Sequence, residues 1–433
     1  MGEKVAAKAQ GDRKMTQAFT LLIKPSGSDC NIDCEYCFYK DRPYEFGHGR
    51  QRMSDEVLEK LVGDYMQLGF PVSGFAWQGG EPTLMGVDFF RRAVELQKKY
   101  GNTGQQVSNT LQTNGILLDE EWCRFFRDNK FLLGISIDGP KEFHDCYRLD
   151  HSGTGTFDRV IRGIETCQKH DVQFSALVLL NNNNVQQPDT LFDFCVENNL
   201  TYLQFIPCVE TNPATGNPTD FSITPRQYGD FLCRLFDLWY DYGPEKLNIR
   251  EFDSLVTHYI MGKHTICTYS KQCAGFVVIE HTGDAFCCEF FVEPQWRLGN
   301  ILETPLEKLA AGSKKRTFAR NKQKLCSKCL VCRHLDICRG GCMKNRMMLD
   351  YRYSMWHGHP GRVSTGWKPV LPSASSEHRE MRIEDRESYF CESYRQFFDY
   401  TVLKFMQIAA GIKNGSVGRH TRSADKIRLC IEK

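Results

Sequence analysis

Short apolar runs alternate with segments of helical periodicity through the first half of the chain. The strand-like runs cover residues 20–24, 74–78, 107–112, 132–137, 173–179 and 202–206. Apolar residues recur with a helical period over residues 54–69, 87–100, 119–129, 156–170 and 188–198. Because parallel strands need crossover connections, this alternation predicts an α/β fold, either a parallel sheet or an open barrel with helices outside. In such a fold the chemistry lies at the carboxyl ends of the strands.

The second half of the chain has a different pattern. Residues 210–225 are typical of a linker, residues 227–242 predict an aromatic-rich helix, and residues 392–410 predict a final amphipathic helix. Between Cys267 and Cys342 the chain is rich in cysteine, glycine and short strands, which indicates a small domain held by metal. We therefore divide the chain into a disordered N-terminus (1–17), a barrel (18–225), a connecting helical segment (226–262), a cysteine-rich domain (263–350), a disordered insertion (351–388), a last cysteine with its helix (389–411) and a basic tail (412–433).

The composition indicates which partners the protein is expected to lack and how its cysteines are used. The 433 residues include 55 Lys and Arg and 53 Asp and Glu, and the resulting net charge of +2 indicates neither nucleic acid nor a membrane surface as a partner. The N-terminus lacks the apolar stretch of a secretory signal, and no run of about 18 apolar residues predicts a membrane span, so we expect a cytoplasmic protein. In a reducing compartment, 20 cysteines favour metal sites over disulfides.

Three cysteines follow the first predicted strand directly, in the spacing Cys30-x3-Cys34-x2-Cys37. On a four-iron cluster, three thiolates leave one iron open to bind something else. A zinc knuckle without its fourth ligand is the alternative. The motif resembles that of the radical S-adenosylmethionine (SAM) superfamily. The resemblance implies a partial (β/α)6 barrel in which the open iron chelates S-adenosylmethionine, and one electron cleaves this cofactor to methionine and a 5′-deoxyadenosyl radical.

A glycine-rich motif ends the second predicted strand, Gln78-Gly79-Gly80-Glu81-Pro82. Two glycines allow a ligand to approach the backbone closely, although a Gly-Gly pair can also be only a turn. Beside the cysteine triad, the motif resembles the one that binds the methionine amino group in the superfamily, which assigns Gly80 to the cofactor. The same resemblance implies four further S-adenosylmethionine contacts, which could otherwise be ordinary strand-end residues: Tyr36, Ser136, Arg148 and Val209.

Eight more cysteines form the third motif. Cys329-x2-Cys332-x5-Cys338-x3-Cys342 is preceded by Cys267, Cys273 and Cys288 and followed by Cys391. Eight thiols make two sets of four, and spacing alone also permits two zinc sites. The pattern resembles the C-terminal cysteine-rich SPASM domain, which implies three [4Fe-4S] clusters in all. The resemblance assigns Cys267, Cys273, Cys288 and Cys342 to a nearer auxiliary cluster, and Cys329, Cys332, Cys338 and Cys391 to an outer one. Cys287 and Cys326 each adjoin a ligand and could exchange roles with it.

The sequence around these motifs resembles the anaerobic sulfatase-maturating enzymes. The resemblance is carried by residues 22–25 (LIKP), 78–84 (QGGEPTL), 111–115 (LQTNG), 136–140 (SIDGP) and 296–301 (WRLGNI). It implies oxidation of a Cys or Ser residue in a sulfatase polypeptide to Cα-formylglycine, with a flavodoxin- or ferredoxin-like electron donor. Another SPASM peptide maturase, which forms a thioether or carbon crosslink on a ribosomal peptide, is the alternative function.

One position departs from the pattern of that family. Glu289 follows Cys288, where the family has an aspartate that acts as the catalytic base. Glutamate carries the same carboxylate with one more methylene, so we predict that Glu289 is the base. A glutamate that only solvates a strand edge is the alternative.

Overall fold

The computed structural model describes residues 18–40, 50–212, 215–347 and 386–415. The predictions for residues 1–17, for 351–385 of the insertion and for 416–433 of the tail lie outside this part of the chain. In the described residues, no helix is long and apolar enough to cross a membrane.

A single ten-stranded sheet runs through the molecule, in the order β10-β9-β8-β1-β2-β3-β4-β5-β6-β7. The strands from β1 to β7 are parallel to one another and follow chain order, β8 is parallel to β1, and β9 and β10 are antiparallel additions. Their bounds are β1 (Thr20–Lys24), β2 (Val72–Trp77), β3 (Gln106–Thr113), β4 (Leu132–Ser136), β5 (Phe174–Leu180), β6 (Tyr202–Pro207), β7 (Asn248–Ile249), β8 (Phe276–Glu280), β9 (Asp284–Phe286) and β10 (Arg297–Asn300).

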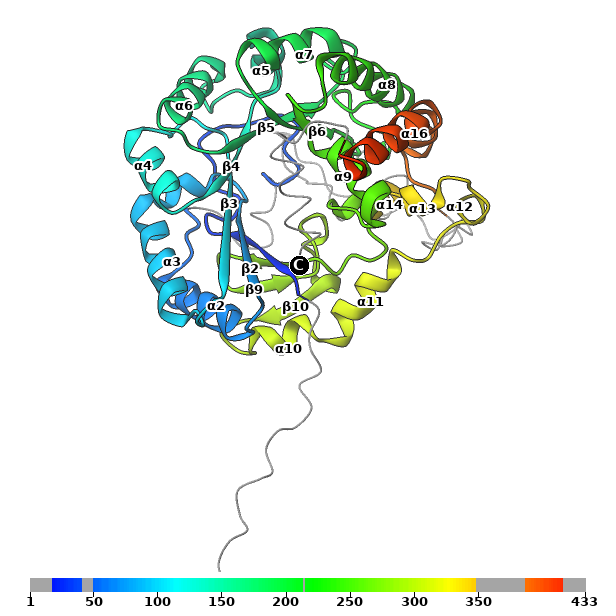
Figure 1. The fold of residues 1–433 in the computed structure, drawn as a ribbon. Coiled ribbons are helices and arrows are strands. Elements are labelled where there is room, and N and C mark those ends of the chain that lie inside the picture. The colour runs from blue at the N-terminus through cyan, green and yellow to red at the C-terminus, as the bar shows by residue number, and fades with distance from the viewer. Residues whose placement is uncertain (1–17, 41–49, 213–214, 348–385, 416–433) are drawn as a thin grey trace, which may run out of the picture.

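Helices form a ring outside the curved sheet, as Figure 1 shows. They start at polar caps where the sequence provides them: the side chain of Ser54 accepts from the backbone of Val57, and Thr224 forms a capping box with Gln227. The crossover helices are α2 (Asp55–Gln67), α3 (Val87–Tyr100), α4 (Glu120–Asp128), α5 (Lys141–Tyr147), α6 (Phe157–Lys169), α7 (Pro188–Glu197) and α8 (Pro225–Tyr242). The predicted α/β fold class, with parallel strands joined by helices that lie outside the sheet, is confirmed.

The C-terminal region extends the same sheet. Strand β8 pairs in parallel with the free side of β1, from Thr20 opposite Phe276 to Lys24 opposite Glu280. The remaining helices are α9 (Arg250–Met261), α10 (Leu306–Ala310), α11 (Ser313–Asn321), α12 (Ser327–Leu330), α13 (Leu335–Cys338), α14 (Met343–Met347) and α16 (Cys391–Lys413). Helix α16 packs on α8 and α9 through aromatic rings such as Phe397, which stacks on Phe252 with 5.5 Å between centroids.

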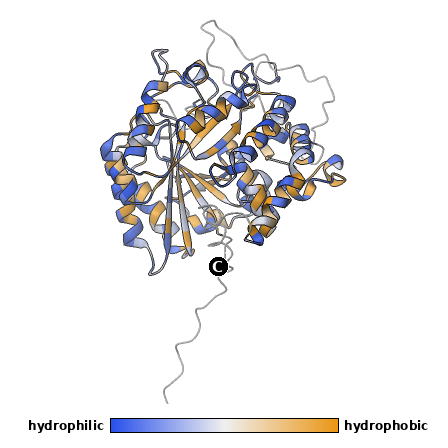
Figure 2. Ribbon diagram, turned by 45° about the horizontal axis from the view of Figure 1, so that its top comes forward, coloured by the Kyte–Doolittle hydropathy of each residue, from blue (hydrophilic) through white to orange (hydrophobic). Residues whose placement is uncertain are grey.

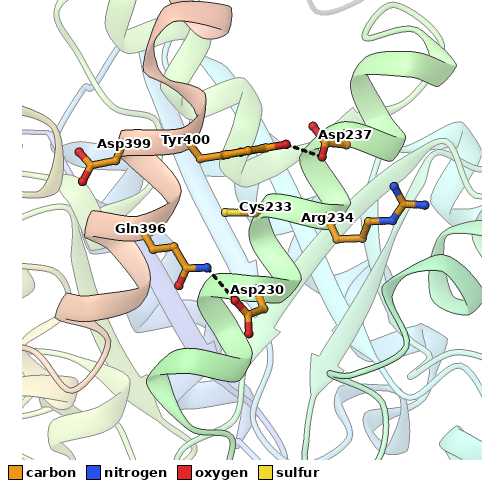
Figure 3. A pocket seen from close by; sticks show the side chains of 7 residues that line it. All are labelled: Asp230, Cys233, Arg234, Asp237, Gln396, Asp399 and Tyr400. Carbon is orange, nitrogen blue, oxygen red and sulfur yellow. Dashed lines mark hydrogen bonds between the residues drawn. The ribbon is translucent and has the colours of Figure 1, made fainter.

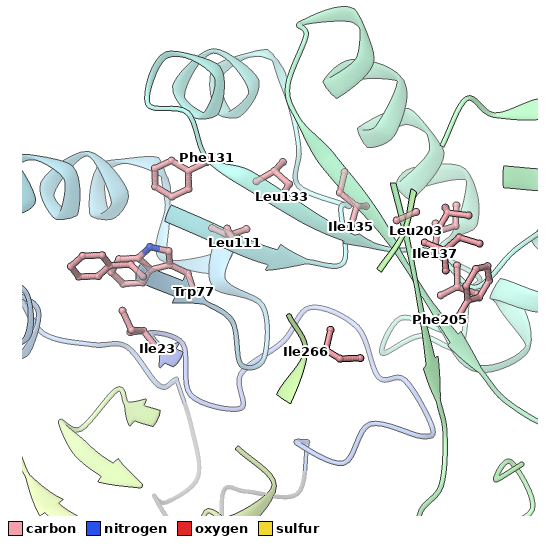
Figure 4. Close-up of a cluster of buried hydrophobic side chains, with 14 of the residues drawn as sticks. Ile23, Trp77, Leu111, Phe131, Leu133, Ile135, Ile137, Leu203, Phe205 and Ile266 are labelled. Atoms are coloured by element: carbon pink, nitrogen blue, oxygen red, sulfur yellow. The ribbon is translucent and has the colours of Figure 1, made fainter. Parts of the chain in front are cut away.

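Apolar side chains of the strands form the core between sheet and helices. Figure 2 shows apolar positions concentrated on the strands and on the inner sides of the helices. Figure 4 shows side chains from several strands in one buried layer, among them Ile23, Trp77, Leu111, Ile135 and Phe205. This packing fixes the strands, and therefore the loops at their carboxyl ends, where the predicted site residues lie.

Candidate active site

The loop after β1 carries the predicted cysteine triad. It is fastened to the segment after α5, because the backbone amide of Asp33 donates to the carbonyl of Leu149 over 2.8 Å, and that of Glu35 donates to Tyr147 over 3.1 Å. The loop thereby lies across the carboxyl ends of the strands. It brings together three thiols, Cys30, Cys34 and Cys37, in one small cluster of buried and half-buried side chains.

The electrostatics of the triad suit a bound cation. Burial raises the pKa of Cys34 to about 12, against the opposing effect of Arg148, whose Nη1 lies 3.8 Å from the sulfur. Burial also raises the pKa of Cys30, and Glu81 and the other two thiols add to the effect. Ionised thiolates are costly here unless iron compensates their charge, so these residues fit an iron–sulfur cluster.

The glycine motif after β2 packs directly on the cysteine loop. The amide of Gly80 donates to the carbonyl of Gly27 over 2.7 Å, and the amide of Glu81 donates to Asp29 over 2.8 Å. A Cβ on Gly80 would lie 2.0 Å from the Asp29 carbonyl oxygen, which no side chain could tolerate. The glycine therefore permits the close approach of two backbone segments, which places the motif against the triad loop.

Glu81 organises the ends of β2 and β3, a role that the sequence analysis missed. Its buried carboxylate accepts from the hydroxyls of Thr83 (2.6 Å) and Thr113 (2.8 Å) and from the backbone amides of Thr83 (3.0 Å) and Asn114 (2.8 Å). Burial raises the pKa of this carboxyl, while these donors oppose the rise. The only sequence signal is the position of Glu81 inside the glycine motif.

Two of the predicted cofactor contacts share one buried carboxylate. Tyr36 donates its hydroxyl to Asp138, and Nε of Arg148 donates to the same oxygen over 3.1 Å. The guanidinium of Arg148 also lies 5.6 Å from the centre of the Tyr36 ring. The pKa of Arg148 is raised well above its usual value, because Asp138 and Tyr36 outweigh the cost of burial. Asp138, within the SIDGP motif, is a second site residue that the sequence analysis did not single out.

The other two predicted contacts lie at neighbouring strand ends. Ser136 is the last residue of β4 and is buried. Val209 follows β6, and its carbonyl accepts from Nζ of Lys344 on α14 over 3.1 Å. Lys344 also pairs with Glu210. The Val209 position is therefore tied to the cysteine-rich region, and Ser136 and Val209 remain predicted contacts.

A buried histidine holds the segment between Asp138 and Arg148. The amide of Asp138 donates to Nδ1 of His144 over 3.3 Å, so Nε2 carries the proton toward Thr156, 2.9 Å away. The Thr156 hydroxyl in turn donates to the carbonyl of Arg148 over 2.8 Å. Burial, assisted by Arg148, lowers the pKa of His144 well below 6.5 and keeps the ring neutral.

This histidine should make folding stability depend on pH. The unfolded imidazole takes up a proton as the pH falls through 6.5, whereas the folded one does not, so acid favours unfolding. Between about pH 7.5 and about pH 5.5, His144 should remove about 1.4 kcal/mol of stability. The control variant is His144→Gln, whose side chain keeps one donor and one acceptor. Urea unfolding of both proteins measures the loss of stability between the two pH values, and we expect this loss to be smaller in the variant by this amount. Equal pH dependence in both proteins would contradict the assignment.

The structure brings together the four thiols predicted for the nearer auxiliary cluster. Cys342 interacts electrostatically with Cys267, Cys273 and Cys288. Burial raises the pKa of Cys288 well above its usual value, and Cys342, Glu289 and Cys273 contribute to the rise. Cys287 is buried in an apolar cluster with Phe291 and Phe318, and Cys288 packs against the same cluster, so Cys287 remains an alternative ligand.

The four thiols predicted for the outer cluster also lie together. Cys391, at the start of α16, interacts with Cys329, Cys332 and Cys338. Cys326 lies within hydrogen-bonding reach of Cys329, so it remains a candidate for the same site. Within the described residues, no three potential ligands converge on the position of a single metal ion. In a four-iron cluster each thiolate binds a different iron, whereas the ligands of a single ion converge on one point.

Glu289 reaches the carboxyl ends of β1 and β2. Its Oε2 accepts from Nε2 of Gln78 over 2.9 Å and lies 3.5 Å from Nζ of Lys24. The side chain of Lys24 is almost fully buried, with 3% exposed, and that of Glu289 is 26% exposed. A residue of the C-terminal region thus stands beside the glycine motif and next to a buried cation.

A hollow between α8 and α16 lies apart from these motifs. Figure 3 shows its lining, in which Gln396 donates to Asp230 over 2.7 Å and Tyr400 donates to Asp237 over 2.6 Å. None of the predicted site residues lines it. The hollow therefore adds no residue to the candidate active site.

Comparison with known protein families covers both parts of the chain. Residues 25–195 match the radical SAM superfamily, and residues 267–333 match the iron–sulfur cluster-binding domain SPASM. With the barrel and the three cysteine groups, these matches define the chain as a radical SAM enzyme with a SPASM domain.

Individual relatives narrow the class. A cysteine-type anaerobic sulfatase-maturating enzyme of Clostridium perfringens (strain 13 / Type A) is 34% identical over 399 residues, which are 91% of this chain and 99% of that protein. A serine-type enzyme of Bacteroides thetaiotaomicron is 37% identical over 343 residues, or 75% of this chain and 83% of the relative. The solved structure of native anSMEcpe with bound AdoMet and Cp18Cys peptide matches with a TM-score of 0.78 and 33% identity, covering 91% of this chain and 100% of that one. The chain belongs to the anaerobic sulfatase-maturating enzymes.

Proposed function

We propose that this enzyme oxidises a Cys or Ser residue of a sulfatase polypeptide to Cα-formylglycine. The observation that carries the proposal is the position of Glu289, 2.9 Å from Gln78 of the glycine motif and beside the triad loop. The oxidation removes one hydrogen atom, one proton and one electron from the target side chain. A carboxylate next to the cofactor motif suits the proton, and the relatives named above are of both the cysteine and the serine type.

The residues around the site divide the remaining tasks. S-adenosylmethionine would be held by the triad together with Gly80, Tyr36, Ser136, Arg148 and Val209, and when bound it would supply the carbon radical that takes the hydrogen atom from Cβ. Glu289 accepts the proton, Gln78 orients its carboxylate, and Lys24 forms an ion pair with it. For a cysteine target, hydrolysis of the resulting thioaldehyde gives the formyl group.

We infer that the eleven predicted cysteine ligands hold three [4Fe-4S] clusters. The triad would hold a cluster with one iron open to S-adenosylmethionine, and each set of four thiols would complete an auxiliary cluster. Clusters held by the auxiliary sets would supply an acceptor for the second electron of the oxidation. Because Cys288 immediately precedes Glu289, the nearer set adjoins the proposed base.

An acidic one-electron carrier, such as a flavodoxin or ferredoxin, is the proposed electron donor. Residues 308–335 contain nine Lys and Arg and no Asp or Glu; two of the nine, Lys315 and Lys322, are buried, and the other seven are exposed. Within this stretch the tip between Cys329 and Cys332 exposes Leu330 and Val331, 64% and 87% accessible. A basic surface with an apolar tip beside the outer cysteines suits a small acidic redox protein.

Mass spectrometry of a peptide tests the proposal. The anaerobic enzyme, given a chemical reductant, S-adenosylmethionine and a peptide with a sulfatase motif, should remove two hydrogens from a serine target or convert a cysteine target to the aldehyde. A thioether or carbon crosslink would instead identify a different SPASM peptide maturase. An unmodified peptide, despite production of deoxyadenosine, would exclude the proposed substrate.

A further inference from the structure

Three buried cations lie among the cysteines of the two auxiliary sets. The residues Lys315, Lys322 and Arg346 expose 5%, 1% and 3% of their surfaces. Across residues 18–40, 50–212, 215–347 and 386–415, none of the three forms an ion pair with Asp or Glu. Buried charges are costly unless an opposite charge compensates them, so this arrangement calls for a nearby anion.

The two lysines point at the nearer cysteine set. Nζ of Lys315 donates to the carbonyl of Cys287 over 2.8 Å and lies 3.5 Å from that of Cys273. Nζ of Lys322 donates to the carbonyls of Cys267 and Thr268, each over 2.7 Å. Both ammonium groups therefore contact the backbone of cysteines in or next to that set.

Arg346 stands between the two auxiliary sets. Its guanidinium donates to four carbonyls, among them that of Gly340 over 2.8 Å and that of Lys322 over 3.0 Å. It interacts electrostatically with thiols of both sets, Cys329 and Cys338 of the outer and Cys273 and Cys342 of the nearer. One buried cation thus acts on both proposed clusters.

We propose that Lys315, Lys322 and Arg346 are positioning residues that compensate the anionic auxiliary clusters and raise their reduction potentials. This inference rests on the proposed cluster assignment. A cluster bound by four thiolates is an anion and gains another negative charge on reduction. Fixed positive charges stabilise the reduced form more than the oxidised form, so they make the auxiliary clusters better electron acceptors. That is the property the oxidation needs when it releases its second electron.

Redox titration of the full-length, iron-loaded enzyme tests the proposal. Lys315→Met removes the charge and keeps the length of the side chain. Electron paramagnetic resonance separates the clusters, because S-adenosylmethionine changes only the spectrum of a cluster with an open iron. In Lys315→Met, an auxiliary signal should shift to more negative potential, so that at a fixed applied potential the ratio of reduced to oxidised cluster falls roughly threefold or more.

Lys314→Met is the matched control. Lys314 adjoins Lys315 on α11, but it is exposed and donates to the carbonyl of Arg297. This variant should titrate like the wild type. Unchanged potentials in Lys315→Met at full iron content would overturn the inference and leave the proposed function intact.

If Lys315→Met loses iron, a variant that conserves the charge shows whether the missing charge is the cause. Lys315→Arg should restore both the iron content and the potential if positive charge is what the site requires. Failure of Lys315→Arg to restore them would overturn the inference. Wild-type protein that binds no iron would overturn the proposed clusters together with it.

Discussion

Glu289→Gln should abolish oxidation of the target peptide while cleavage of S-adenosylmethionine continues. The amide cannot accept the proton, but it keeps the size of the side chain and its contact with Gln78. Loss of a positioned general base costs about 10²- to 10⁴-fold in rate. Parallel assays of deoxyadenosine and of formylglycine peptide should therefore show radical formation uncoupled from product.

Glu289→Asp is the informative companion. It restores the residue type of the family pattern and keeps the carboxylate, so peptide oxidation should remain measurable. Full peptide turnover by Glu289→Gln would remove this residue from the proton transfer. Equal loss of deoxyadenosine and product would instead indicate that Glu289 supports cofactor binding.

Cys34→Ala should eliminate both deoxyadenosine formation and peptide oxidation. Cys34 is the most central thiol of the triad loop and contacts Arg148. If the eleven cysteines hold three clusters, the wild type should contain about twelve irons and the variant about eight. Iron and sulfide analysis of anaerobically purified protein, with an assay for deoxyadenosine, measures both effects.

Cys208→Ala is a matched control for that change. Cys208 is buried in the same small cluster of side chains as the triad, and burial raises the pKa of its thiol, but it lies outside the predicted ligand set. The control should keep about twelve irons and its radical chemistry. A Cys34→Ala protein that still forms deoxyadenosine would contradict the role of the triad.

The barrel could be read from the sequence because its strands and helices carry strong local patterns. The first strand was predicted with its observed bounds, and the other five differ by one or two residues at an end. Helix α5 was missed because seven residues give too short a periodic signal. The pairing of β8 with β1 was also missed, since it joins segments about 250 residues apart and leaves no local trace in either.

The site was predictable only where spacing carries the chemistry. Cysteine spacing, together with the family resemblance, led to the thiol groups that the structure brings together, whereas Glu81 and Asp138 act through hydrogen bonds to residues distant in the sequence, such as Thr113 and Tyr36. Lys315 and Lys322 illustrate the limit most clearly. In the sequence they belong to a basic stretch that looks like a solvated surface, and only the fold shows that both are buried.

The pairing of β8 with β1 makes the barrel and the region of the auxiliary cysteines parts of one sheet, so neither can be removed without exposing the other. A shortened chain that ends after α9 would keep the triad, the glycine motif and β2, but it would lose β8, the other neighbour of its first strand. The exposed backbone of Thr20–Lys24 would then invite pairing with other chains. We therefore expect new substrate preferences in such an enzyme to evolve through changes in loops and side chains. Exchange of the region with the auxiliary cysteines would remove β8 and expose the edge of β1, the strand that leads into the triad loop.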